Sequence, residues 1–318
     1  MKRFLGIWFC VIALSGCDDG DLNVDTIDFT AVTAKSCTDN NLIFKLKESE
    51  ALILNLPTTV FTTTPTPVGS PLELKINSEN KVVYNFYNGN VAEGNVCDLI
   101  PPASPSVNKQ LTASEGTIQI TTTTIKTVDE KNNSTRISGY NHNIIFKNIK
   151  FIKSDGTFQL YETLAFGDYY KALDPKIPFN FISTGLKICS DKNNVYKFNE
   201  SESLVLAIDP TLIVNEVTPI GSPRIGTIGL VNNKLTYSLF NGLVPTEYFC
   251  ATTTPSLPTI NQTWLGKAGG TIEVTTTTNG PKSFVHTIVF KNVTLEKAGS
   301  NFQLGDSYSF GELQTLVP

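Results

Sequence analysis

The chain is poor in several residue types on which common functions depend. Its 318 residues include only 2 histidines and 1 methionine, and charged residues make up 17% of the total, against about 25% in an average soluble domain. No run of Lys or Arg is present, although a protein that binds nucleic acid needs a basic surface. We therefore expect no nucleic-acid partner.

Motifs that indicate an enzyme are also lacking. The sequence has no Gly-rich phosphate loop and no serine in a nucleophile-elbow context. Glu48 and Glu50, repeated as Glu200 and Glu202, resemble paired carboxylates, but their spacing on a turn favours a solvated face. We predict no catalytic residue, no cofactor and no metal site, and we favour a non-enzymatic function.

The two histidines, His142 and His286, occupy the same place in two similar stretches of sequence. A shared metal-binding or acid–base role is one interpretation, because imidazole serves both purposes. The simpler interpretation is a histidine at the start of a strand that hydrogen-bonds the backbone.

A long apolar run is absent, and the one short run lies at the N-terminus. Lys2 and Arg3 precede apolar residues from Phe4 to Ala13, too few to span a bilayer as a helix. The run ends in Leu-Ser-Gly and Cys17, which resembles the lipobox of bacterial lipoproteins. The resemblance implies a signal peptide over residues 1–16, an acidic tether over 17–26, and a lipid bilayer as partner through acylated Cys17. An ordinary secretory signal is the alternative.

Aspartates follow this cysteine at positions 18, 19, 21 and 25. An acidic cluster here resembles the surface-display signal of Bacteroidota lipoproteins, whereas an aspartate after the cysteine resembles the inner-membrane retention signal of enterobacterial ones. The abundance of Asn, Thr, Lys and Ile favours the first. We expect a lipid-anchored envelope protein of the outer membrane, and its orientation toward the periplasm or the cell surface stays open.

The remainder of the chain is one unit written twice. EGTIQITTTT from Glu115 returns as GGTIEVTTTT from Gly269, and HNIIFKNIKFIKSDGTFQL from His142 returns from His286. Residues 27–172 and 173–318 are therefore predicted to be two homologous domains, a size that suits single cores. The join around Asp174 and Pro175 is short, so we expect little free swinging. Beyond the signal region, the sequence resembles no family of known activity.

Four cysteines remain after Cys10 and Cys17 are set aside. Cys37 and Cys97 fall in the first repeat, and Cys189 and Cys250 fall at matching places in the second. Of the three possible pairings, the duplication selects one bridge inside each repeat, which suits an exported protein.

The pattern of the body predicts an all-β fold. Thr117–Ile125 and Thr271–Thr278 alternate apolar and threonine residues, as a strand with one wet face does. We predict return strands from His142 and His286, and β-hairpins that join 72–76 to 81–87 and 225–231 to 234–240. Two tandem antiparallel β-sandwiches, each pinned by a disulfide, fit best, and a barrel is the alternative.

Candidate binding residues are few and aromatic. Trp264 is the one tryptophan outside the signal region, with Gln110 opposite it in the first repeat, and it forms either a platform for a sugar or peptide or part of the packing. Tyr169 and Tyr170 are placed at the seam between the domains. We expect a binding module for a glycan or an envelope protein. A structural subunit of an envelope complex and a polymer hydrolase are the alternatives.

The copies also disagree, and the disagreements are where we expect the function to lie. The polar segment 128–138 has no counterpart in the second repeat, and Trp264 has none in the first.

Overall fold

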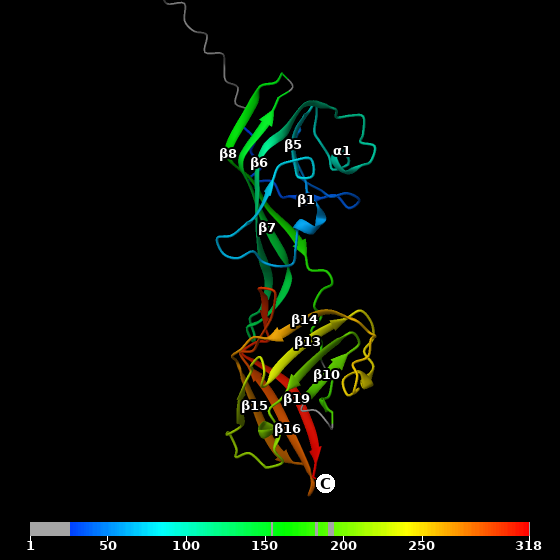
Figure 1. Cartoon of the computed structure of the whole chain (residues 1–318), viewed down its shortest axis with the longest axis vertical. Helices are drawn as coiled ribbons and strands as arrows, with labels where there is room; N and C mark the ends of the chain where they lie inside the picture. Colours follow the sequence, from blue (N-terminus) through cyan, green and yellow to red (C-terminus); the bar gives the residue numbers. More distant parts are fainter. Residues whose placement is uncertain (1–25, 154, 182–183, 190–193, 318) are drawn as a thin grey trace, which may run out of the picture.

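The computed structural model describes residues 26–153, 155–181, 184–189 and 194–317. Cys17 and the signal peptide lie outside these residues, as does the tether up to Asp25. The described chain forms two β-rich lobes along one long axis (Figure 1). The expectation of an all-β, antiparallel fold is confirmed. No helix in the described ranges is long and apolar enough to cross a membrane.

The first lobe contains eight strands and two short helical turns. Its elements are β1 (Lys35–Ser36), β2 (Leu42–Lys47), β3 (Glu50–Asn55), η1 (Thr58–Val60), β4 (Leu72–Lys75), β5 (Lys81–Tyr87), α1 (Gly94–Cys97), β6 (Val107–Asp129), β7 (Ser134–Ile152) and β8 (Phe158–Ala172).

The second lobe contains the remaining elements. They are β9 (Lys187–Ile188), β10 (Asn194–Asn199), β11 (Glu202–Ala207), η2 (Pro210–Ile213), β12 (Arg224–Thr227), β13 (Lys234–Phe240), η3 (Thr246–Tyr248), β14 (Ile260–Gly266), β15 (Thr271–Thr278), β16 (Ser283–Lys291), β17 (Thr294–Lys297), β18 (Ser300–Gln303) and β19 (Ser307–Leu316).

The two lobes share one topology. In the first, the strand order is β1-β2-β3-β5-β6-β7-β8, with β4 paired to β6. In the second, one sheet has the order β18-β17-β14-β13-β11-β10-β9 and the other the order β12-β15-β16-β19. The two strand orders are the same when each long strand of the first lobe is matched with two strands of the second. β6 then corresponds to β14 and β15, β7 to β17 and β16, and β8 to β18 and β19. Each lobe is thus a sheet that curls over on itself.

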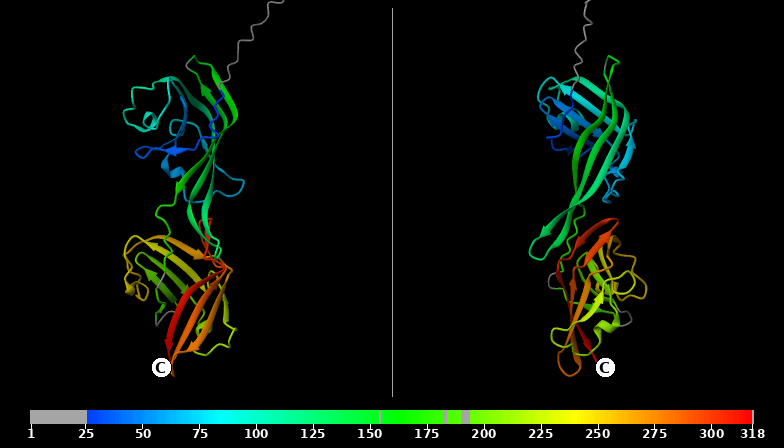
Figure 2. Two further views of the ribbon diagram at one scale, coloured as in Figure 1. Left: turned by 180° about the vertical axis from the view of Figure 1, so that it is seen from behind. Right: turned by 90° about the vertical axis from the view of Figure 1, so that its left-hand side faces the viewer.

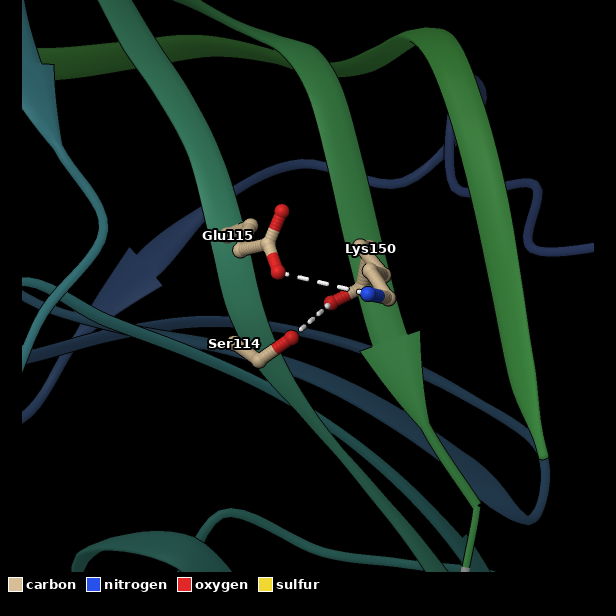
Figure 3. Close-up of polar contacts among 3 residues, drawn as sticks. All are labelled: Ser114, Glu115 and Lys150. Atoms are coloured by element: carbon tan, nitrogen blue, oxygen red, sulfur yellow. Dashed lines mark hydrogen bonds and ion pairs between the residues drawn. The ribbon is translucent and has the colours of Figure 1, made fainter. Parts of the chain in front are cut away.

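The curl occurs where glycine and asparagine take left-handed backbone conformations. Gly116 has φ +134° and Asn148 has φ +48°, and Gly270 and Asn292 take φ +74° and +54° in the second lobe. These residue types adopt positive φ at the lowest cost. Next to Gly116 the β6–β7 register shifts: Ser114 Oγ donates to the Lys150 carbonyl (3.3 Å), and Lys150 Nζ donates to Glu115 Oε1 (3.2 Å; Figure 3).

The two predicted hairpins over 72–87 and 225–240 are wrong. β4 pairs with β6 and β5 pairs with β3 and β6, so the two segments lie on opposite sides of the curl. β12 and β13 are separated in the same way. The cause lies in the tertiary structure. The Asn77 side chain accepts hydrogen bonds from the Glu79 and Asn80 amides, and this turn forms a corner between the two sides of the curled sheet. Its polar residues are the same types that a hairpin turn uses.

Both predicted disulfides are confirmed. Cys37–Cys97 and Cys189–Cys250 each join Cα atoms 5.4 Å apart, with sequence separations of 60 and 61. In the first lobe the bridge ties the turn after β1 to α1. Closing a loop of this size stabilises the fold by roughly 4 kcal/mol in the chain-entropy model.

The extra residues of the first repeat do not form a loop. They extend β6 and β7 into a hairpin, here called the arm (residues 126–139), that reaches the second lobe beside β18 (Figures 1 and 2). Tyr140 Oη lies 2.9 Å from Ser300 Oγ, and Lys126 Nζ donates to Asn301 Oδ1 (2.8 Å). Ile137 and Tyr140 belong to the second lobe's core cluster. The arm therefore fixes the two lobes together.

Candidate functional site

A cavity of about 240 Å³ lies in the first lobe beside its disulfide. The turn 36–43 forms one side, and η1 and the end of β8 form the other, through Thr58, Phe61, Tyr169 and Lys171. Drug-sized pockets usually enclose about 300–1,000 Å³. The space therefore suits a ligand of about one sugar residue, or one end of a larger molecule.

The turn is held in place before any ligand arrives. Asn40 Oδ1 accepts from the Leu42 amide (2.9 Å), and Asn40 Nδ2 donates to the Cys97 carbonyl (3.2 Å). The Cys37 amide donates to the Leu42 carbonyl (3.0 Å). Such an Asx turn, closed by the disulfide, is a pre-organised wall.

Two aromatic rings form the opposite wall. Phe61 and Tyr169 meet edge to face with their centroids 5.1 Å apart, a favourable geometry for aromatic pairs. Lys171 Nζ donates to the Phe61 carbonyl (3.1 Å). Lys171 is the one charged side chain among the lining residues that the structure describes. The cavity therefore combines an aromatic face with a single positive charge.

His142 is buried directly behind this wall. Its ring packs against Phe61 and Tyr169, with centroids 5.1 and 6.1 Å away, and Nδ1 lies 2.9 Å from Thr122 Oγ1. Its Nε2 is buried and has no hydrogen-bond partner. Burial, helped by the charge of Lys171, lowers the pKa of His142 to about 4. The imidazole is neutral at physiological pH and belongs to the core, not to the start of a strand.

The second repeat has the equivalent histidine, His286, in a different hydrogen-bonding environment. Thr276 Oγ1 lies 2.8 Å from His286 Nδ1, as in the first repeat, but His286 Nε2 also meets Thr315 Oγ1 (2.9 Å) and Asn215 Oδ1 (3.2 Å). Strand pairing aligns His142 with Tyr169 and His286 with Leu313. Two residues on, Lys171 corresponds to Thr315. Two cavity residues, Tyr169 and Lys171, are therefore replaced by Leu313 and Thr315 in the second repeat.

The structure places the other predicted binding residues elsewhere. Trp264 is 1% exposed and packs on Phe302, with its Nε1 donating to Gln262 Oε1 (3.3 Å). Its counterpart is Leu111 rather than Gln110, because Tyr237 pairs with Trp264 and Tyr84 pairs with Leu111. The second repeat carries one more residue at the following bend, which displaces the sequence alignment by one.

Tyr169 and Tyr170 do not form the contact between the two lobes. Tyr169 lines the cavity, while the exposed Tyr170 donates from Oη to the Ser138 carbonyl (3.0 Å) and lies over Gly139 at the base of the arm. The seam is built by the arm, above all by Arg136, and by Tyr140 directly after it. Arg136 and Tyr140 lie just before the repeated segment that starts at His142, and this feature of the sequence could have identified them as residues with a role of their own.

The expectation of a solvated carboxylate pair is wrong for Glu202. Its side chain is buried, accepts from the Asn180 amide (2.7 Å) and from Tyr237 Oη (2.8 Å), and its pKa is raised by burial. The first repeat's Glu50 stays half-buried. Among the described residues, no group of three or more His, Cys, Asp and Glu side chains is placed to hold a metal ion.

Comparison with protein-family models finds no match, and comparisons with curated proteins and with solved structures find no similar chain.

Proposed function

We propose that this protein is a lipid-anchored envelope protein whose first repeat binds a small, sugar-like ligand in the cavity at Tyr169 and Lys171. The pre-built cavity is the observation that carries the proposal. Asn and Thr side chains of the turn supply donors and acceptors for hydroxyl groups, and the aromatic wall supplies an apolar face for a sugar ring. The ammonium of Lys171 favours a ligand with a carboxylate or another anionic group.

Binding accounts for this cavity better than hydrolysis does. Glycoside hydrolysis uses a pair of carboxylates on either side of the scissile bond. Neither Asp nor Glu is among the lining residues that the structure describes, and the lining cysteine, Cys37, is oxidised in a disulfide. The polar groups present can hold and orient a ligand.

A glycan array probed with residues 18–318, followed by calorimetry of the glycans that bind, tests the ligand. We expect acidic glycans among them, with Tyr169→Ala and Lys171→Met each weakening binding at least about tenfold, or 1.4 kcal/mol. Tyr170→Ala is the matched control, because it removes a ring from the next position but none from the cavity. Unchanged affinity in both cavity variants contradicts the proposal.

The anchor is tested separately. Cys17→Ala is expected to move the protein from the membrane pellet to the soluble fraction, because two or more acyl chains are needed for stable attachment. Protease added to intact cells then reports the leaflet. Persistence of the variant in a carbonate-washed membrane pellet argues against lipidation at Cys17.

A further inference from the structure

The hairpin that joins β7 to β8 lies at the end of the first lobe opposite the second lobe (Figures 1 and 2), and its outer face is apolar. Ile152 pairs with Phe158 and Lys150 pairs with Leu160, so these side chains share one face. The alternate residue Phe151 is buried in the core. Ile152, Phe158 and Leu160, here called the apolar patch, are 44%, 59% and 59% exposed. Exposed apolar patches mark contacts with a protein or a membrane.

The equivalent hairpin of the second repeat, β17–β18, is polar at this place. There Glu296 pairs with Asn301. Ile152 occupies the place of Glu296 in the repeated sequence, and the register of the first hairpin is shifted by one residue. The shift turns Phe158 outward, whereas Phe302 faces the core. The apolar patch therefore distinguishes the first repeat from the second.

The one charged side chain beside the apolar patch is already paired. Lys150 Nζ lies 4.8 Å from the ring centroid of Phe158 and donates to Glu115 Oε1 (3.2 Å; Figure 3). The lysine and the glutamate offset each other's charge. A contact made by the patch is therefore apolar rather than electrostatic.

The chain enters the first lobe beside this hairpin. Ile27 is buried, and its amide donates to Tyr161 Oη (3.3 Å), one residue along β8 from Leu160. Residues 18–26 separate Ile27 from Cys17, and a fully extended segment of this length reaches roughly 35 Å. A lipid on Cys17 therefore keeps this end of the first lobe close to the bilayer.

The second lobe shows what the equivalent hairpin does. Lys126 Nζ donates to Asn301 Oδ1 (2.8 Å), and Tyr140 Oη lies 2.9 Å from Ser300 Oγ. The β17–β18 hairpin thus contacts the part of the chain that precedes its own repeat. What precedes the first repeat is the tether and the anchor site, so the same arrangement directs the β7–β8 hairpin toward the membrane.

We propose that the apolar patch rests on the phospholipid surface to which Cys17 is attached, so that the protein stands on the membrane by the end of its first lobe. The inference rests on the proposed lipid anchor. Phe and Leu side chains at such a surface insert at the boundary between headgroups and acyl chains. Three side chains hold a protein there only weakly, and the short tether supplies the high effective concentration that makes the contact persist.

Chemical anchoring tests this contact whether or not cells acylate Cys17. Residues 17–318 are coupled through the Cys17 thiol to maleimide-bearing lipid in phosphatidylethanolamine–phosphatidylglycerol vesicles, since the other cysteines of this segment form the two disulfides. Phe158→Trp places a fluorescent probe in the patch, and Trp264 is a buried, constant background. We expect a blue shift and at least about twofold quenching by lipid that is spin-labelled near the headgroup, because the ring enters that region.

Two further variants make the test specific. Ile220→Trp puts the probe at a fully exposed position of the second lobe, and we expect no quenching there. Ile152→Ser with Leu160→Ser, combined with Phe158→Trp, is expected to abolish the quenching. Circular dichroism is expected to be unchanged, because both serine positions are exposed.

Three results overturn the proposal. An anchored Phe158→Trp protein that spin-labelled lipid leaves unquenched refutes the contact. Equal quenching of Ile220→Trp shows that the protein lies flat on the membrane. A dimer of residues 18–318 in sedimentation velocity that Ile152→Ser with Leu160→Ser abolishes assigns the patch to a second copy. The two proposals fail separately, because wild-type protein in the soluble fraction of cells refutes the anchor and an unquenched anchored probe refutes the patch.

Discussion

His142 and His286 show how two identical residues in equivalent strands acquire different environments. Both rings are fully buried, and each accepts or donates one hydrogen bond with a strand threonine. The second ring nitrogen of His286 has two partners, whereas that of His142 has none. The partners of His286 are Thr315 and Asn215, whereas Lys171, at the position equivalent to Thr315, bonds the Phe61 carbonyl instead.

The pKa of His142 makes a prediction about stability and pH. It falls to about 4 in the folded protein from an ordinary value near 6.5, so between these values the unfolded chain binds the proton and the folded chain does not. The free energy of unfolding therefore decreases as the pH falls from 6.5 to 4, by on the order of 3 kcal/mol. Urea titrations across this range measure the slope.

His142→Leu is expected to flatten that slope. His286→Leu is the matched variant, because it leaves Thr276, Thr315 and Asn215 without their shared partner, and we expect it to lower stability at every pH by about 1–3 kcal/mol. A wild-type slope retained in His142→Leu would falsify the assignment.

Lys197 is a second buried ionisable group, and we expect its burial to lower the free energy of unfolding. Its ammonium lies 4.8–5.3 Å from the ring centroids of Phe181, Tyr308 and Phe310, and burial lowers its pKa to about 8. At pH 7 the lysine is charged, and burial disfavours the charged ammonium. We expect Lys197→Met to raise the free energy of unfolding by about 1–3 kcal/mol at pH 7, and by less at pH 10, where the lysine is neutral in the folded state. Equal or lower stability at pH 7 would show that the rings compensate fully for burial.

At the scale of elements, the bends in the long strands decide the architecture. A Cβ on Gly116 would approach the Ile149 Cα to 2.9 Å, on a backbone with φ +134°. Gly116→Ala is therefore expected to cost about 3 kcal/mol or more, through strain and a backbone clash. Gly69 also has positive φ (+75°) but no atom within 4 Å of the added carbon, so Gly69→Ala is the control and is expected to cost about 1 kcal/mol. Thermal and urea unfolding compare the two, and equal losses argue against the clash.

The strands themselves were predictable because alternation records which side of a strand is buried. The pairing of 117–125 with the strand from His142 follows from that pattern and is confirmed by the register Thr122 to His142. The partners of 72–76 were not predictable. A four-residue polar turn serves a hairpin and a corner equally well, and the choice depends on which sheet has an unfilled edge.

At the scale of the whole molecule, the arm joins two lobes that have separate cores. Arg136 is its central contact, because the guanidinium stacks on two rings and bonds the Gln303 carbonyl. We expect Arg136→Ala to weaken the coupling by about 2–4 kcal/mol, as for truncation at the centre of an interface.

Calorimetry tests the coupling directly. The wild type is expected to unfold in one transition and Arg136→Ala in two, with an increase in the radius of gyration measured by small-angle scattering. Lys131→Ala, an exposed substitution at the tip of the same arm, is the control and should behave as the wild type. One sharp transition in both variants would show that the short join around Pro175 couples the lobes without the arm.

The sequence by itself determined the β class, the duplication and both disulfides, because these depend on local alternation, on repeated residues and on the matching places of four cysteines. Tertiary structure decided the rest. Whether the residues of 128–138 form a free loop or an arm depends on a surface supplied by another part of the chain. The cavity at Tyr169 exists because the curl brings the end of β8 against a turn more than 120 residues away in the chain. Phe158 is exposed and Phe302 is buried because the strand register differs by one residue: Phe302 pairs with Leu295, whereas the equivalent Phe151 pairs with Gln159 rather than Phe158.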